Sequence, residues 1–285
     1  MTRTLDSTKP TTAATAKPIV LVPGRRELNP ARAARIDRRV TNTLAVLIPL
    51  LLIGSWELAA QVGAIDARFF PAPTTIIGSW GESIADGTYW THLGVSAQRI
   101  VLGYLFGTIP GIIAGLLIGR ARLVGRALEP TIIALYTIPK LAILPLLLLV
   151  FGIGETPKLV LIGITTFWIV LINTTGALEE VQIAHIEAGR SFGLSKIEMI
   201  RHIVLPSAAP QIFTGLRIAA GMAVLALVGA EFVAAKAGLG YMIWNSWNIG
   251  IPSFMYIGII SISILGVLTN TVLRLLQRAA LPWDR

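Results

Sequence analysis

The sequence predicts an all-α protein with six helices that cross a lipid bilayer, and three observations predict this fold class. First, hydrophobic residues make up 54% of the 285-residue chain and charged residues only 14%, whereas soluble proteins carry about a quarter charged residues. Second, the mean hydropathy is +0.72, which implies more apolar surface than one aqueous core can bury. Third, six apolar runs approach the roughly 20 residues that a helix needs to span the hydrocarbon core of a bilayer. A soluble enzyme is therefore the wrong class.

Each of the six runs contains few charged residues. In chain order they are Leu44–Val62, Leu93–Gly119, Pro130–Gly154, Leu159–Leu178, Pro210–Ala235 and Phe254–Leu273. The third run contains Lys140 beside Pro139, and Pro145 follows. Because proline breaks the hydrogen-bond ladder of a helix, we expect this span to be kinked.

The distribution of basic residues predicts the orientation of the chain. Eighteen of the 24 Lys and Arg residues lie in segments that share a side with the N-terminus, and only Arg68, Lys158 and Lys236 lie in the opposite loops. Loops that face the cytoplasm are enriched in Lys and Arg. We therefore expect a multi-pass protein of the inner or plasma membrane with both termini in the cytoplasm. This distribution explains the net charge of +9 without a nucleic-acid partner.

Composition also predicts the domain organisation. Residues 1–43 are polar and rich in Thr, Pro, Ala and Arg, which predicts a mostly disordered, basic cytoplasmic tail with a solvated helix start at Asn29–Arg39. Residues 44–281 form the six-span domain, and residues 282–285 form a short cytoplasmic C-terminus. The chain has no Cys and only three His, which excludes thiolate ligands and cysteine nucleophiles, and we expect no metal site. It also lacks the glycine-rich phosphate loop that ends in Gly-Lys-Ser/Thr, so we expect no nucleotide site.

The longest internal cytoplasmic loop, about residues 179–209, carries local folding signals. Gly193 suits the left-handed position just after a helix, and Ser195-Lys-Ile-Glu198 matches a capping box that starts the next helix. Pro206 follows, and Pro210 suits the first turn of the fifth span. The loop is therefore predicted to be a short helix, a tight turn and a second short helix. Ile197, Ile200 and either Ile203 or Val204 could form an apolar stripe that needs a partner.

This loop resembles a family signature. Glu187-Ala188-Gly189, three residues, Gly193, nine residues and Ile203-Val204-Leu205-Pro206 are similar to the EAA motif of ABC importer permeases, which reads E-A-A, three residues, G, nine residues, I-x-L-P. Gly189 replaces the second alanine, and both residues are small. Two further segments, Pro139–Glu155 and Gly238–Ile243, resemble the nitrate, sulfonate and taurine type of these permeases.

The resemblance implies a type I ABC importer permease fold and a non-enzymatic pore subunit with no catalytic residue and no cofactor of its own. In this family, cytoplasmic ABC ATPase subunits bind ATP and accept the loop helices, an extracytoplasmic solute-binding protein delivers the solute, and two permease copies form the pore. It assigns ATPase coupling to Glu187, Ala188, Gly189, Gly193, Ile203, Leu205 and Pro206. The expected function is import, by alternating access, of a small organic anion such as an aliphatic sulfonate or taurine, or of nitrate. A homodimer is expected.

Two other classes are alternatives. An autonomous cation-coupled secondary transporter would use paired carboxylates at mid-membrane depth, and Glu57 and Glu231 are the only acidic candidates. An intramembrane hydrolase would need more than Glu179, Glu180 and His185. An ATPase subunit that copurifies with the chain would distinguish the permease from both alternatives.

Four residues are candidates for the pore or the solute site: Lys140, Arg217, Tyr241 and Trp244. Lys140 either binds solute or reaches free carbonyl groups at the helix break. Tyr241 and Trp244 belong either to an interfacial aromatic belt or to the external vestibule. Arg99, Arg217 and Glu231 lie near span ends, where we expect their side chains to extend towards water.

Overall fold

The computed structural model describes residues 30–283. The predicted tail up to residue 29 and the last two residues lie outside the described residues. The chain divides into two compact units, Met1–Ser55 and Trp56–Arg285. The described part of the first unit belongs to helix α2 (Pro30–Gln61), which contains the first predicted span and begins within the segment 29–39.

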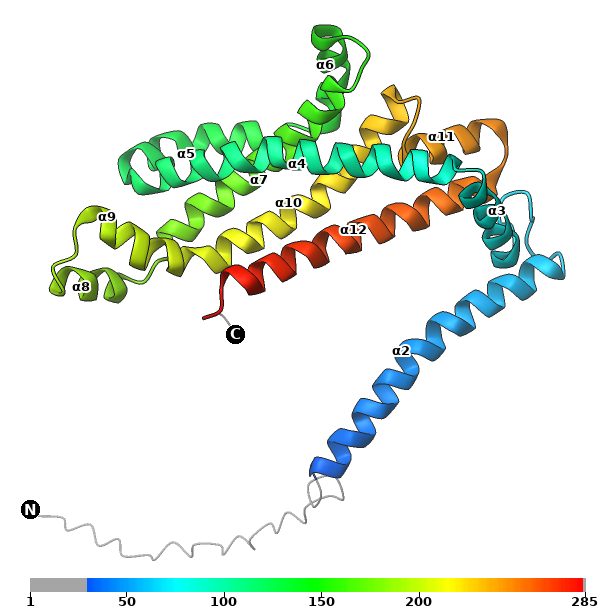
Figure 1. Cartoon of the computed structure of the whole chain (residues 1–285), viewed down its shortest axis with the longest axis horizontal. Helices are drawn as coiled ribbons and strands as arrows, with labels where there is room; N and C mark the ends of the chain where they lie inside the picture. The colour runs from blue at the N-terminus through cyan, green and yellow to red at the C-terminus, as the bar shows by residue number, and fades with distance from the viewer. Residues whose placement is uncertain (1–29, 284–285) are drawn as a thin grey trace, which may run out of the picture. The chain divides into compact units, whose positions relative to one another are not determined.

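The remaining predicted spans are found in the second unit (Figure 1). Four of them are the long helices α4 (Thr88–Arg120), α7 (Thr156–Glu179), α10 (Leu205–Ala234) and α12 (Pro252–Ala280). The third span is broken, as Pro139 predicted. Helix α5 (Arg122–Thr137) is followed by the 3₁₀ turn η1 (Lys140–Ile143) and helix α6 (Leu144–Phe151), and the two halves are bent by 77°. Five described helices are long and apolar enough to cross a membrane, and the bent pair makes a sixth.

Two helices in the second unit were not predicted. Helix α3 (Pro73–Ala85) has proline in its first turn, where the missing amide hydrogen costs nothing. Helix α11 (Leu239–Ile249) follows Gly238, whose φ of 125° favours glycine. Both are shorter than a membrane span, so the length of apolar runs does not predict them.

A row of glycines brings α4 and α7 together. Gly103, Gly107, Gly111, Gly115 and Gly119 recur at every fourth position of α4, so they lie along one face of the helix. A β-carbon at Gly115 would lie only 2.6 Å from the Cβ of Thr174, and one at Gly119 only 2.8 Å from the Cδ1 of Leu178. The row of small residues therefore lets the two helices cross closely.

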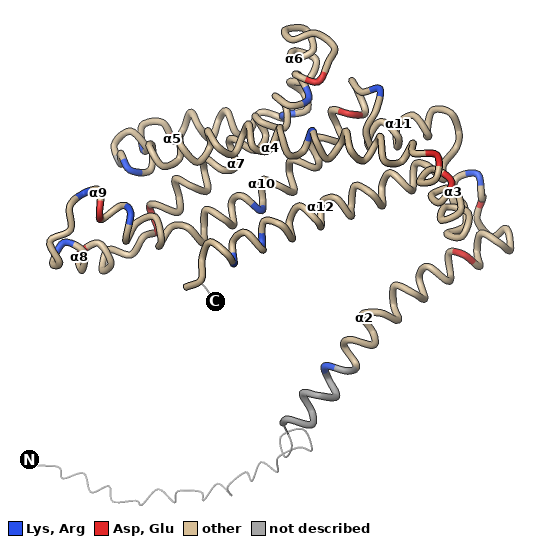
Figure 2. The backbone as a smooth tube through the Cα atoms, in the orientation of Figure 1, with Lys and Arg blue, Asp and Glu red and all other residues tan. Residues whose placement is uncertain are grey.

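Helix α10 packs against α4, α7 and α12 and supplies much of the core. Small buried residues of α10 meet larger side chains of its neighbours. They are Ala219, Ala220, Ala223 and Ala226 on α10, with Ile100 and Tyr104 of α4 and Ile162, Ile169 and Val170 of α7 in the same cluster. Figure 2 shows long charge-free stretches in α4, α7, α10 and α12. The charged residues of the second unit lie mainly towards helix ends and connections.

Candidate functional site

The predicted short helix, tight turn and second short helix are present in the loop at 179–209. Helix α8 (Ile183–Ser191) ends just before Gly193, which has a φ of 73°. The amide of Leu194 donates to the carbonyl of Gly189 at 3.1 Å, which closes the helix end as a Schellman motif does. Hydrogen bonds between residues close in sequence therefore determine this turn.

The second helix of the loop begins with the predicted capping box. The Ser195 hydroxyl accepts from the Glu198 amide at 3.4 Å, and the Ser195 amide donates to the Glu198 carboxylate at 2.9 Å. These bonds start α9 (Lys196–Met199). The predicted capping interaction is confirmed.

The end of the second loop helix differs from the prediction. Helix α9 does not stop before Pro206 but continues through the π-helical turn η2 (Ile200–Val204) into α10. The amide of Leu205 donates to the carbonyl of Ile200, five residues earlier. This wider turn gives the ring of Pro206 room against the preceding carbonyls. Pro206 therefore occupies the first turn of α10, and Pro210, predicted for that place, lies inside the helix.

Gly189 allows α8 to lie directly against the second loop helix. It is buried, and a β-carbon there would crowd the Cδ1 of Ile203 and lie 2.8 Å from the Cε of Met199. The substitution of the second alanine of the EAA motif by glycine therefore fits this contact. Ile203, Leu205 and Pro206 are half-buried.

Other loop residues are open to the surroundings. Glu187, Ala188 and Gly193 are exposed, as are Phe192 (85%) and Ile197 (76%). The predicted apolar stripe is therefore divided. Ile200, Ile203 and Val204 are partly covered within the chain, because α8 packs on them. Of the stripe, only Ile197 is exposed.

A cavity of about 580 Å³ lies between the loop helices and the ends of α4 and α7. Its lining includes Arg120 of α4, Leu178 of α7, Glu187 and Arg190 of α8, and Val204 of η2. The first loop helix is thus separated in part from the helices that cross the membrane. The contact at Gly189 joins α8 to Met199 of α9 and Ile203 of η2, and η2 leads directly into α10.

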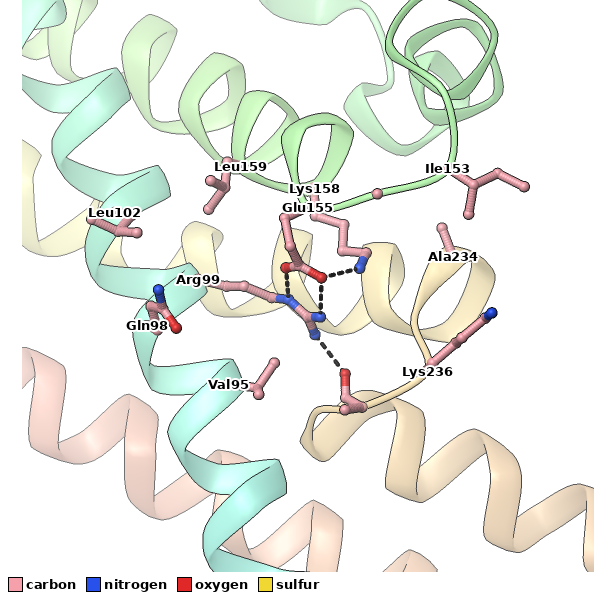
Figure 3. A pocket seen from close by; sticks show the side chains of 12 residues that line it. Val95, Gln98, Arg99, Leu102, Ile153, Glu155, Lys158, Leu159, Ala234 and Lys236 are labelled. Atoms are coloured by element: carbon pink, nitrogen blue, oxygen red, sulfur yellow. Dashed lines mark hydrogen bonds and ion pairs between the residues drawn. The ribbon is translucent and has the colours of Figure 1, made fainter.

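A second charged site lies at the opposite end of the long helices, beside a cavity of about 520 Å³ (Figure 3). Arg99 of α4 binds both carboxylate oxygens of Glu155, through Nε at 2.6 Å and Nη2 at 2.7 Å. Lys158 of α7 donates to the same carboxylate at 2.8 Å. The side chains of Arg99 and Lys158 are only 4% and 3% exposed, whereas that of Glu155 is 58% exposed. Two buried cations therefore converge on one accessible carboxylate.

Glu231 of α10 completes this charge cluster from the buried side. Its carboxylate, which is fully buried, accepts from Arg99 Nη1 at 2.7 Å, from the Ser96 hydroxyl at 2.8 Å and from the Gly240 amide at 2.7 Å. The same Nη1 donates to the Ala237 carbonyl at 2.6 Å. A buried charge is costly unless it is paired and hydrogen-bonded, and here both conditions are met.

Glu155, which lies just before α7, is more acidic than an ordinary glutamate because of its hydrogen bonds. The Arg99 hydrogen bonds, together with the bond from Lys158, lower the pKa of Glu155 from its ordinary 4.5 to about 2. The carboxylate is therefore charged throughout the physiological pH range. It remains available as a partner for the two cations.

The charge cluster corrects three expectations. Arg99 and Glu231 were expected to extend towards water from the span ends, but they are buried and bind each other. Lys158 was expected in an external loop, but it is buried in the first turn of α7. In each case an oppositely charged partner compensates the loss of water.

The two cationic candidates, Lys140 and Arg217, differ in their hydrogen bonds. The ammonium of Lys140 donates to the carbonyls of Leu135, Tyr136 and Ile138, which the break after α5 leaves without helical partners. The half-buried Arg217 has a buried Nε that makes no hydrogen bond among the described residues.

The two aromatic candidates, both on α11, stack on other rings. Tyr241 is half-buried and stacks on His92 with 5.9 Å between the ring centroids. Trp244 is exposed and stacks on Phe232 at 5.4 Å. Both side chains therefore have packing partners on α4 or α10.

The sequence contains one signal for the charge cluster. Arg99 lies at the start of the second span and Glu231 at the end of the fifth, so the predicted topology already places both at the same membrane face. Opposite charges at one depth of two spans are candidates for an ion pair. Glu155 and Ser96 carried no such signal, because only packing brings them to this pair.

The fold and the two sites define a multi-pass, all-helical membrane transport protein with an organised loop on one side. Residues 107–282 match the family model described as binding-protein-dependent transport system inner membrane component. The chain belongs to this family, and it is a membrane-spanning permease component of an ABC importer.

Related permeases match over most of the chain. A Bacillus subtilis protein named as an aliphatic sulfonates transport permease is 34% identical over 84% of this chain and 86% of its own length. The taurine transport system permease protein of Escherichia coli is 35% identical over 87% of this chain and 91% of its own. The nitrate import permease protein of Synechococcus elongatus is 36% identical over 75% and 82%.

A solved structure shares the fold. An inward-facing form of the MetNI methionine ABC transporter matches with a TM-score of 0.58 and 21% identity, covering 66% of this chain and 94% of the matched chain. At this identity the likeness concerns the fold alone. It agrees with the predicted type I importer permease fold.

Proposed function

We propose that this permease imports a small oxyanion, of the sulfonate or nitrate class, from an extracytoplasmic solute-binding protein. The observation that carries the proposal is the similarity to three permeases whose names specify aliphatic sulfonates, taurine and nitrate. These solutes share a compact, negatively charged group with several oxygen acceptors. A single transport path for such a group needs the same kind of hydrogen-bond donors in each case.

Energy coupling is proposed to pass through α8 and the turn at Gly193. The exposed Phe192 and Ile197 offer apolar contacts, and Glu187 offers a charge beside them, which suits a groove on a cytoplasmic ABC ATPase subunit. ATP is bound and hydrolysed on that separate chain. Both termini and this loop face the cytoplasm, and two copies of the chain form the pore.

The burial of Glu231 argues against the secondary-transporter alternative. A carboxylate that carries a coupling cation must exchange ligands during transport. Glu231 is fully buried and already bound by Arg99, Ser96 and Gly240. Its charge therefore serves the permease itself.

The test is reconstitution of the permease with its ATPase subunit in proteoliposomes that enclose ATP and receive the solute-binding protein outside. Radiolabelled taurine and nitrate should accumulate only when all three components and ATP are present. Methionine, a zwitterion without a sulfonate, serves as the control solute. Accumulation that needs a cation gradient but no ATPase subunit would refute the proposal.

A further inference from the structure

The cations Arg99 and Lys158 are arranged around a position that a free oxyanion can also occupy. They come from different helices, α4 and α7, and are both almost completely buried. Both donate to the exposed carboxylate of Glu155 (Figure 3). Among the described residues, the ammonium of Lys158 has no other hydrogen-bond or ion-pair partner. Its burial is therefore compensated by an anion at this one position.

The two edges of the Arg99 guanidinium group have different partners. Nη1 points to the interior, where it binds Glu231 and the Ala237 carbonyl. Glu231 cannot leave easily, because Ser96 and Gly240 also hold it and it is fully buried. The opposite edge, Nε and Nη2, binds only the accessible Glu155. An anion can therefore be exchanged at this edge while Arg99 keeps its internal anchors.

The adjoining cavity fits a small anionic solute. A guanidinium edge binds two oxygens of a carboxylate, sulfonate or nitrate side by side. The cavity of about 520 Å³ has apolar walls that include Val95, Leu102 and Leu159, and Lys236 stands at its rim. This size is within the usual range for small-molecule sites. The lining offers an apolar surface to a short organic tail and cations to the charged end.

We propose that Arg99 and Lys158 form a binding site for the oxyanion group of the transported solute, and that Glu155 is an internal competitor for this site. An arriving anion displaces the Glu155 carboxylate and takes over its bonds to both cations. Displacement frees the segment ahead of α7 from α4. The proposal rests on the proposed function, because it assigns a location to the anion that the permease is proposed to carry.

The experiment is a titration of the purified full-length permease in phosphatidylcholine nanodiscs with sodium methanesulfonate and, separately, sodium nitrate. Sodium chloride keeps the ionic strength constant. The melting temperature reports binding, because a ligand stabilises the folded state that binds it. Glu155→Gln removes the charge of the competitor but keeps its size. Glu82→Gln, at an exposed carboxylate of α3 outside the cluster, is the matched control.

The midpoint is the methanesulfonate concentration that gives half of the full rise in melting temperature. We expect it to be at least about tenfold lower in Glu155→Gln than in the wild type. Hydrogen bonds to a charged group are worth more than those to a neutral one, so the glutamine competes less well for the two cations. The midpoint of Glu82→Gln should equal that of the wild type. Adding Lys158→Gln to Glu155→Gln should raise the midpoint again. If Glu155→Gln does not fold, Glu155→Asp, whose shorter side chain reaches Arg99 poorly, should shift the midpoint in the same direction.

Equal midpoints in the wild type and the Glu155 variants would overturn the site, as would an effect that chloride reproduces. Uptake by the wild-type transporter separates this failure from failure of the proposed function. If taurine is imported but the midpoints do not change, the cluster is only structural and the proposed function stands. If the midpoints shift as expected but no oxyanion is imported, the proposed function fails.

Discussion

A side chain added at Gly193 should weaken binding of the ATPase subunit, and the size of this loss follows from the backbone conformation. Its φ of 73° lies in the left-handed region, and a β-carbon would meet nothing within 4 Å. A substitution there is therefore opposed by backbone conformation and not by a clash within the chain. For residues other than glycine this conformation costs about 1–2 kcal/mol, least for asparagine. If the ATPase binds only the turn seen here, Gly193→Val should weaken association by about 5- to 30-fold.

Gly193→Asn is the matched variant, because it adds a side chain of similar size but tolerates the left-handed conformation. The assay is binding of the purified ATPase subunit to permease in nanodiscs, followed by solute-stimulated ATP hydrolysis. Gly193→Val should lose affinity, whereas Gly193→Asn should remain near the wild type. Wild-type affinity in Gly193→Val would refute the role of the turn. An equal loss in both variants would show that the ATPase has no space for a side chain, so backbone strain would not be the cause.

Three further predictions concern topology, packing and pH. Because the chain has no Cys, Ser191→Cys should react with impermeant thiol reagents only from the cytoplasm and Glu82→Cys only from outside; labelling from one side would contradict the orientation. Gly115→Ala should lower the free energy of unfolding by about 1–3 kcal/mol, because the added methyl group overpacks the contact with α7. Gly94→Ala, on the same helix but with nothing within 4 Å, should be neutral or stabilising by up to about 1 kcal/mol. Equal melting temperatures of the two variants would contradict the tight crossing. The pKa of Glu155 is lowered from 4.5 to about 2, so its ion pairs stabilise the protein fully above pH 4.5 and lose this effect as the pH falls through about 2. A difference in melting temperature between the wild type and Glu155→Gln that stays constant on acidification would refute this.

Local sequence determined the conformation of the loop at 179–209 and the positions of the spans. The turn at Gly193 and the cap between Ser195 and Glu198 depend on bonds between residues a few positions apart, so their signals stand together in the sequence. The spans follow from the length of apolar runs, which the thickness of the bilayer fixes. The break at Pro139 was predictable because proline acts on its own helix.

Only the tertiary structure decided where the charges inside the spans go. Arg99 and Glu231 are 132 residues apart, and each looked like a residue that reaches water from a helix end when it was considered alone. The close packing of α4 on α7, which the glycine row permits, and of α7 on α10 brings Arg99, Glu155, Lys158 and Glu231 together. The energy of a buried charge depends on its partners and on the water it loses, and no local pattern contains either.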